Sequence, residues 1–109
     1  MNLFQQIKEA KEQLQGVVMA TPLSENLNIS NEFNATVLLK REDLQTVRSY
    51  KIRGAYNKIR TLSNEEKAQG VICASAGNHA QGVAYSCKLL QIKGKIYMPK
   101  TTPKQKVKQ

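Results

Sequence analysis

The chain has 109 residues, of which 40% are hydrophobic and 23% are charged. This length fits one domain, and the composition is that of a globular protein rather than a disordered or fibrous one. No apolar run approaches the roughly 18 residues of a membrane span, and the N-terminal residues lack a signal peptide's apolar stretch. Two cysteines and one histidine make neither a disulfide framework nor a zinc ligand set, so we expect a cytoplasmic protein without a metal site.

Charge is distributed unevenly along the chain. Residues 1–66 carry nine Lys or Arg and eight Asp or Glu, whereas residues 67–109 carry eight lysines and no acid, which gives a net charge of +9. Such a basic half is typical of a nucleic-acid partner or a basic tail, and a chain that lacks an acidic remainder would show it too. The last lysines have no interleaved aromatic residues to stack bases, so we interpret them as a solvated face: Lys100, Lys104, Lys106 and Lys108.

The N-terminal third predicts one helix followed by irregular chain. An apolar stripe at helical spacing predicts a helix that ends by Gly16. The stripe consists of Leu3, Phe4, Ile7, Ala10 and Leu14. Thr21-Pro22 requires extended or turned backbone, and residues 24–35, which are rich in Asn, Ser and Glu, predict an irregular or partly helical stretch.

Beyond residue 35, strands alternate with helices. Strands are predicted at residues 36–40, 71–74 and 95–98, and the two segments between them have apolar residues at helical spacing. These are Ile52, Ala55, Tyr56, Ile59 and Leu62 in the first, and Ala80, Val83, Ala84, Cys87 and Leu90 in the second. Gly94 is the expected stop of the second helix, and Thr102-Pro103 opens a last one. The order predicts an α/β fold with a parallel sheet and flanking helices, and three strands indicate an incomplete sheet.

Residues 48–55, Arg-Ser-Tyr-Lys-Ile-Arg-Gly-Ala, place Lys51 at a helix N-terminus, with Ser49 or a neighbour as the cap. The positive end of the helix and two nearby arginines favour a neutral amine, which can attack a carbonyl to form a Schiff base. Gly54 inside the helix predicts that something approaches the backbone closely. Considered alone, these residues favour the plainer alternative of a solvated lysine in an ordinary helix.

Residues 75–82, Ser-Ala-Gly-Asn-His-Ala-Gln-Gly, connect a predicted buried strand to the next helix. Sheets of this class bind ligands at such junctions, where small residues let backbone N–H groups converge on a carboxylate or phosphate. The spacing matches neither the dinucleotide fingerprint nor the P-loop. A tight turn in which Asn78 and His79 cap the helix is an equally good interpretation.

The other chemically interesting residues have plain interpretations. We expect the single histidine, His79, to cap or pack rather than to act as a general base. Cys73 and Cys87 are expected in the core. The acidic pairs Glu42-Asp43 and Glu65-Glu66 are interpreted as surface and turn residues.

These motifs in this order resemble the threonine dehydratases, which belong to the fold type II family of pyridoxal-phosphate enzymes. The resemblance lies in residues 40–45, 48–57 and 74–84, with Thr21-Pro22-Leu23 and residues 98–103 also matching. It runs from about Val17 to the last residue. The combination is specific, although each motif separately is not.

The resemblance implies a pyridoxal 5'-phosphate cofactor between two α/β domains, as in the β subunit of tryptophan synthase. Residues 1–109 would be the N-terminal segment of the catalytic domain. Lys51 matches the catalytic lysine that holds the cofactor and acts as base on the substrate Cα proton. Asn78 matches the residue that hydrogen-bonds the cofactor's ring hydroxyl, and Tyr50 stands where the family usually has phenylalanine near the ring. The substrate carboxylate would be bound by the backbone of Ser75, Ala76, Gly77, Asn78 and His79.

The implied reaction converts L-threonine to 2-oxobutanoate and ammonia in isoleucine biosynthesis, in a full-length protein that is a homo-oligomer without nucleic-acid or membrane partners. The phosphate cradle, the partner of the pyridine nitrogen and any regulatory domain would follow residue 109, so we expect the 109 residues alone to be inactive. Within the enzymes, a related dehydratase acting on L-serine or a serine racemase stays an alternative. A basic nucleic-acid-binding module and a non-catalytic remnant that pairs with an intact relative are alternatives from other classes.

Overall fold

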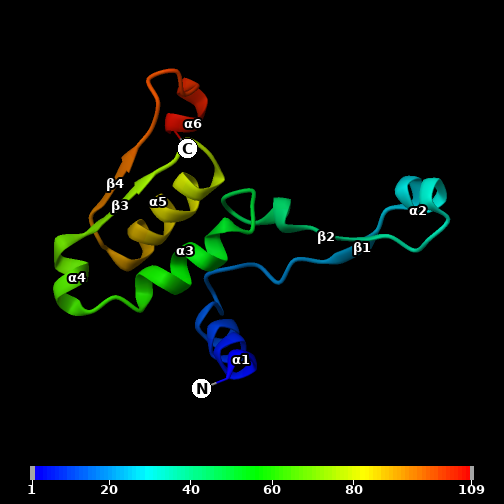
Figure 1. Ribbon diagram of the computed structural model, residues 1–109, viewed down its shortest axis with the longest axis horizontal. Coiled ribbons are helices and arrows are strands. Elements are labelled where there is room, and N and C mark those ends of the chain that lie inside the picture. Colours follow the sequence, from blue (N-terminus) through cyan, green and yellow to red (C-terminus); the bar gives the residue numbers. More distant parts are fainter. Residues whose placement is uncertain (1, 109) are drawn as a thin grey trace.

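The computed structural model describes residues 2–108, which form a packed body and several protruding segments (Figure 1). The body consists of α3 (Lys51–Arg60), α4 (Asn64–Gln69), β3 (Val71–Ala74), α5 (Asn78–Leu90) and β4 (Gly94–Tyr97). The arm, residues 23–40, consists of β1 (Leu23–Glu25), α2 (Leu27–Phe33) and β2 (Leu38–Lys40). The remaining elements are α1 (Leu3–Gln13), the 3-10 helix η1 (Glu42–Leu44) and α6 (Lys104–Lys108).

The body is built on a parallel strand pair and two packed helices. β3 and β4 pair in parallel from Val71↔Gly94 to Ala74↔Tyr97, and α5 is the crossover between them. α5 packs on both strands and on α3. The core lies between these two helices and is formed by Ala55, Ile59, Val83 and Cys87. The opposite face of the strands is open, since Ile72 and Tyr97 are more than half exposed.

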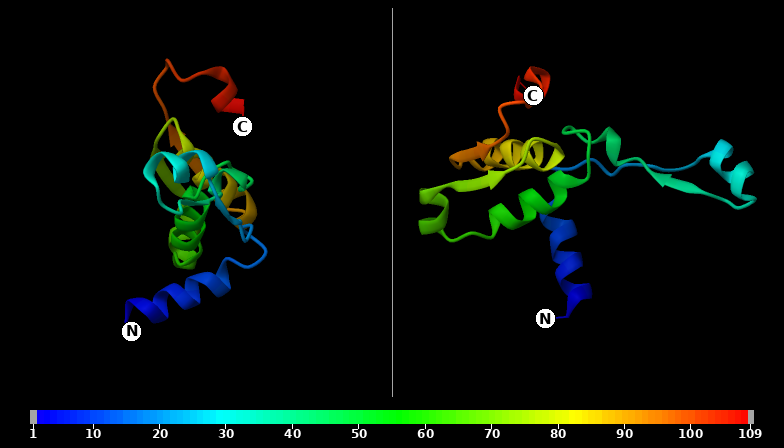
Figure 2. Two further views of the ribbon diagram at one scale, coloured as in Figure 1. Left: turned by 90° about the vertical axis from the view of Figure 1, so that its right-hand side faces the viewer. Right: turned by 45° about the horizontal axis from the view of Figure 1, so that its top comes forward.

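The arm extends away from the body (Figures 1 and 2). β1 and β2 pair antiparallel from Leu23↔Lys40 to Glu25↔Leu38, and α2 lies at the tip. Its large apolar side chains are exposed: Leu23, Leu27, Phe33, Leu38 and Leu39. The accessible surface of 8299 Å² exceeds the roughly 6,100 Å² expected of a compact monomer of this mass. The arm and α1 therefore stand out from the body with little packing of their own.

Most predicted elements are confirmed, but the strand at residues 36–40 belongs to a different sheet. It forms β2, which pairs antiparallel with β1 rather than in parallel with the other strands. The reason is topological. Residues 41–50 form η1 and a series of turns that lead from the arm to the body, so β2 stays paired with β1 in the arm while α3 and α4 lead on to β3. β1 itself lies where the sequence predicted irregular or partly helical chain.

Two details of the body also differ from expectation. Gly94 does not end α5 as predicted. The helix ends at Leu90 and is capped by Gln91 in the left-handed region, whereas Gly94 begins β4. Gly94 is needed for another reason, because a Cβ atom there would lie 2.9 Å from Cys87 Sγ. The residues expected in a turn at Glu65-Glu66 instead open α4, where Ser63 and Glu66 form a capping box.

Candidate functional site

A cavity of about 480 Å³ opens beside α3, β3 and the start of α5. One end of the cavity, which we call its chemical end, contains the polar side chains of Tyr50, Lys51 and His79, because α3 and α5 both begin there. Its other end is apolar, where Leu62 and Ile72 follow the C-terminal part of α3 and the start of β3. Lys51 and His79, which lie 28 positions apart in the sequence, are thus brought to one cavity.

Lys51 is the first residue of α3 and is half-buried. Its backbone N–H donates to Ser49 Oγ at 3.3 Å, so Ser49 contributes to the helix start as predicted, although Tyr50 occupies the cap position itself. The Lys51 ammonium nitrogen lies 4.9 Å from the centroid of the Tyr50 ring, a cation–π distance. The amine therefore has an aromatic neighbour on the cavity wall.

The segment before α3 is fixed by alternating burial. Gln45, Val47 and Ser49 are buried, whereas the residues between them are exposed. Arg48 has a φ of 57°, a left-handed conformation that is uncommon outside glycine, so the chain bends immediately before Lys51. The course of the backbone leading to the lysine is consequently set by packing on both sides of that bend.

Gly82 places the start of α5 against the first turn of α3. A Cβ atom at Gly82 would lie 3.1 Å from the carbonyl carbon and oxygen of Lys51 and 3.3 Å from the Ile52 nitrogen. Only glycine leaves room for this approach without displacement of one helix. Asn78 lies one turn earlier in α5, so the same contact holds residues 75–79 near Lys51.

Residues 75–79 form a hydrogen-bonded turn into α5. The Ser75 N–H donates to the Tyr97 carbonyl at 2.9 Å, and the Gly77 N–H donates to Ser75 Oγ at 3.3 Å. Gly77 is the cap residue and no side chain caps α5, so the interpretation of Asn78 and His79 as helix caps is wrong. Both are exposed residues of the first turn. His79 lines the cavity, whereas residues 75–78 lie beside it rather than on its wall.

A cluster that the sequence analysis missed surrounds Glu42. Its carboxylate accepts hydrogen bonds from Arg53 Nε at 2.8 Å and from Arg53 Nη2 at 2.7 Å. Thr21 Oγ1 donates to the same carboxylate at 2.6 Å. Hydrogen bonds from Arg53, and to a lesser extent from Thr21 and Gln45, lower the pKa of Glu42 to about 2 against the opposing effect of burial. Glu42 is therefore not the solvated surface residue that was expected, because its side chain is only 15% exposed.

Three further expectations are decided by the structure. No described protein atom lies within 4 Å of a Cβ atom built at Gly54, so no part of the protein makes the predicted close approach, and the glycine lines the cavity. One of the two arginines near Lys51, Arg53, is paired with a carboxylate. Cys87 lies in the core with Cys73 packed against it, as predicted, and burial raises the pKa of both thiols.

Neither a membrane helix nor a metal-ligand cluster is found among residues 2–108. No helix there is long and apolar enough to cross a membrane. No three His, Cys, Asp or Glu side chains in this part of the chain gather around a common point.

Residues 14–109 match a family model described as pyridoxal-phosphate dependent enzyme. The chain is 57% identical over 103 residues to the biosynthetic L-threonine dehydratase IlvA of Bacillus subtilis, covering 94% of this chain and 24% of that protein.

Solved structures agree in fold. The processed form of threonine deaminase isoform 2 from Solanum lycopersicum superposes with a TM-score of 0.85 at 44% identity, over 97% of this chain and 31% of that one. Maize serine racemase superposes with a TM-score of 0.86 at 35% identity, over 94% and 31%. The chain thus spans about a quarter of the length of the curated relatives it matches.

Proposed function

Because this chain belongs to the pyridoxal-phosphate-dependent enzymes, we propose that it is the N-terminal segment of the catalytic domain of an L-threonine ammonia-lyase. The reaction would convert L-threonine to 2-oxobutanoate and ammonia in isoleucine biosynthesis. The observation that carries the proposal is the placement of the Lys51 amine on a cavity wall, beside the start of α5. The likeness to biosynthetic threonine dehydratase at 57% identity supports threonine as the substrate.

The residues at the chemical end of the cavity fit pyridoxal phosphate. A lysine amine is the group that bonds covalently to an aldehyde cofactor. The Tyr50 ring offers an aromatic surface next to that amine, and the cavity of about 480 Å³ is within the roughly 300–1,000 Å³ typical of cofactor sites. Asn78 at the first turn of α5 is available to donate its amide to a ring hydroxyl.

The chain's own residues have distinct roles in this proposal. Lys51 Nζ would hold the cofactor, and once the substrate's amine had displaced it from that bond, the freed amine would remove the proton from the substrate Cα. The backbone N–H groups of residues 75–79 bind the substrate carboxylate, because a helix start presents donors without intrahelical partners. Pyridoxal phosphate, when bound, supplies a ring that accommodates the electron pair left at Cα. Tyr50 would lie near that ring, since its own ring is 4.9 Å from the Lys51 nitrogen.

The proposal extends to the setting of the reaction. We expect the full-length enzyme to be a cytoplasmic homo-oligomer that acts on small amino acids, with L-serine as a second substrate. Because the chain is also similar to maize serine racemase, the test must compare activity on threonine with activity on serine.

A chimera tests the proposed function directly. In it, these 109 residues replace the matching quarter of the Bacillus subtilis relative, and the holoenzyme is assayed for 2-oxobutanoate from threonine and for pyruvate from serine. We expect threonine to be the better substrate. Lys51→Ala should lower the rate by at least ~100-fold, because it removes both the cofactor's attachment and the base.

Lys58→Ala is the matched control, since Lys58 lies on the same helix and the same cavity two turns further along. It should retain activity close to that of the unmodified chimera. A chimera that prefers serine, or that survives Lys51→Ala, would contradict the proposal.

A further inference from the structure

We propose that Glu42 and Arg53 are positioning residues for Lys51, whose ion pair fixes the first turn of α3 in the orientation that directs the amine into the cavity. The proposal rests on the function proposed above for Lys51. We name the surrounding cluster the clasp, and it consists of Met19, Thr21, Glu42, Gln45 and Arg53.

The ion pair is the strongest kind of side-chain contact in the described residues. Both Arg53 nitrogens that reach Glu42 do so at 2.7–2.8 Å, the parallel two-bond geometry that adds orientation as well as energy. The two side chains are 35% and 15% exposed, so the pair is less screened than one in open solvent. Such a contact defines the rotation of the helix turn that carries Arg53.

The clasp holds the chain on both sides of Lys51. Before the lysine, the buried Gln45 side chain accepts from the Met19 N–H at 2.9 Å and donates to the Met19 carbonyl at 2.8 Å. After it, Arg53 Nη2 also reaches the Met19 carbonyl, at 3.4 Å. Residues 45–53 are therefore tied at both ends to one backbone position, and the segment between them has little freedom to shift.

Helix geometry turns this restraint into a position for the amine. Residues two apart in a helix are roughly 200° apart around its axis, so Arg53 and Lys51 occupy nearly opposite sides of α3. Arg53 binds the clasp on one side, and Gly82 contacts the Lys51 backbone on another. Release of the clasp would remove the polar restraint on the Arg53 side of α3, and the first turn could then rotate on its packed side.

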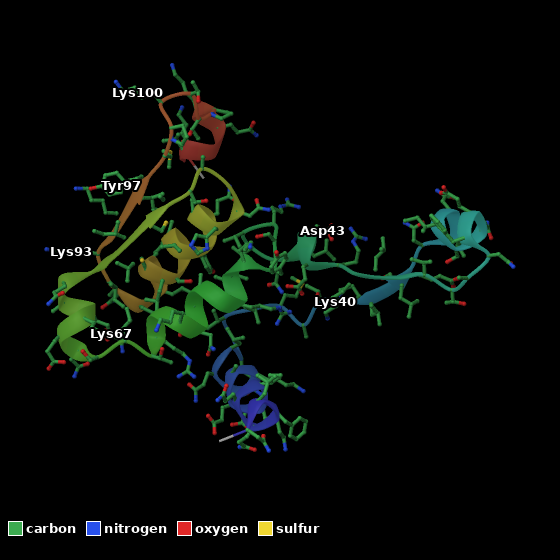
Figure 3. All side chains as sticks on the ribbon, viewed as in Figure 1. Lys40, Asp43, Lys67, Lys93, Tyr97 and Lys100 are labelled. Atoms are coloured by element: carbon green, nitrogen blue, oxygen red, sulfur yellow. The ribbon has the colours of Figure 1, made fainter. Side chains whose placement is uncertain are left out.

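A neighbouring ion pair provides a matched control. Arg41 binds Asp43 through two hydrogen bonds of 2.9 and 2.7 Å, much as Arg53 binds Glu42. These side chains are 41% and 58% exposed, and the pair is local to η1 without a bond to α3. Figure 3 labels Asp43 at the root of the arm, next to the clasp in sequence but outside it.

The test measures how selectively pyridoxal phosphate labels Lys51. The chimera is incubated with pyridoxal phosphate, reduced with borohydride and digested, and the labelled fraction of Lys51 is divided by that of Lys58 on the same helix. We expect Glu42→Gln and Arg53→Met to lower this ratio by roughly tenfold, because small displacements of a reacting group have large effects. Arg53→Lys should retain part of the selectivity, since it keeps the charge and loses the second hydrogen bond.

Two controls separate positioning from stability. Asp43→Asn should leave the ratio within about twofold, since exposed pairs contribute little. Ser63→Ala, which destabilises the distant α4 cap, should lower the urea midpoint without lowering the ratio. In the holo chimera, the clasp variants should also change the visible circular dichroism per bound cofactor, a signal that depends on cofactor orientation rather than on the folded fraction.

The outcomes distinguish the two proposals. If the unmodified chimera labels Lys51 no more than Lys58, the function proposed for Lys51 is wrong. If it prefers Lys51 and both clasp variants keep that preference and the same dichroism, only the positioning role is overturned. An equal loss in Ser63→Ala would likewise overturn it, because general stability would then explain the effect.

Discussion

The body and the arm of this molecule contain similar fractions of apolar residues but bury them to different extents. In the body, side chains such as Ile52 and Val83 are at most 5% exposed, whereas in the arm Leu27 and Phe33 are 66% and 67% exposed. The arm joins the body through the clasp at its root. The comparison teaches that the candidate site depends on a small core and one polar cluster, while the arm's elements depend mainly on local hydrogen bonds and caps.

The two regions should differ most in how much unfolding free energy is lost when a large apolar side chain is replaced by alanine. Ile52 is 1% exposed, and Ile52→Ala should lower the free energy of unfolding by about 2–5 kcal/mol. Phe33→Ala in the arm removes an exposed ring and should change it by no more than about 0.5 kcal/mol. Urea unfolding followed by far-UV circular dichroism measures both. Equal losses would show that the arm packs as the body does.

Acid should weaken the junction between the two regions. Glu42 has a folded-state pKa of about 2 against 4.5 for a free glutamate side chain, so its stabilisation is complete above pH 4.5 and is lost as pH falls toward 2. We expect about 1–2 kcal/mol, less than the full shift implies, because Arg53 is a third exposed.

Urea midpoints between pH 5 and pH 2 measure this loss. Glu42→Gln should flatten this part of the profile, and Asp43→Asn should leave most of it. If Glu42→Gln leaves the pH profile unchanged, the ion pair of Glu42 does not explain the loss of stability in acid.

Two glycines of the body should respond in opposite directions. Gly82→Ala brings a Cβ atom against the Lys51 carbonyl and should destabilise by about 1 kcal/mol after its gain in helix propensity. Gly54→Ala meets no described atom within 4 Å and should stabilise α3 by about 0.5–1 kcal/mol. Thermal unfolding measures both changes, and a stabilising Gly82→Ala would contradict the close helix contact.

The smallest effect compares one kind of cap in the two regions. Ser63 caps α4 in the body, and Asn26 caps α2 in the arm by accepting the Ile29 N–H at 3.0 Å. Ser63→Ala should lower the unfolding free energy of the body by about 1 kcal/mol. Asn26→Ala should leave that value unchanged and instead speed amide hydrogen exchange within residues 27–33. A common effect on both regions would show that they unfold together.

Much of the candidate site was predictable from local pattern. The helix that begins at Lys51 and the loop that leads into α5 follow from apolar spacing and from the small residues at 75–77, and the structure has both elements. The family was predictable too, because the motifs occur in one order. The roles of individual residues at the site stay predictions, since the protein structure shows their placement and not their chemistry.

Three of the differences from the sequence analysis share a cause. The position of β2, the Glu42–Arg53 pair and the function of Gly82 all depend on partners distant in sequence. Arg53 lies 11 residues from Glu42 and Met19 lies 26 from Gln45, separations at which no periodicity operates. The missed α4 is different, because Ser63 and Glu66 form a capping-box pattern that is visible in the sequence.

The sequence by itself determined the local elements of this protein, since helix and strand periods, caps and glycines act over a few residues. It also determined the motif set that identifies the family. Only the tertiary structure decided which strands pair, where the Glu42 carboxylate is satisfied and how Lys51 meets the start of α5. Those outcomes depend on burial and on hydrogen bonds between distant segments, whose free energies arise only when the chain has folded.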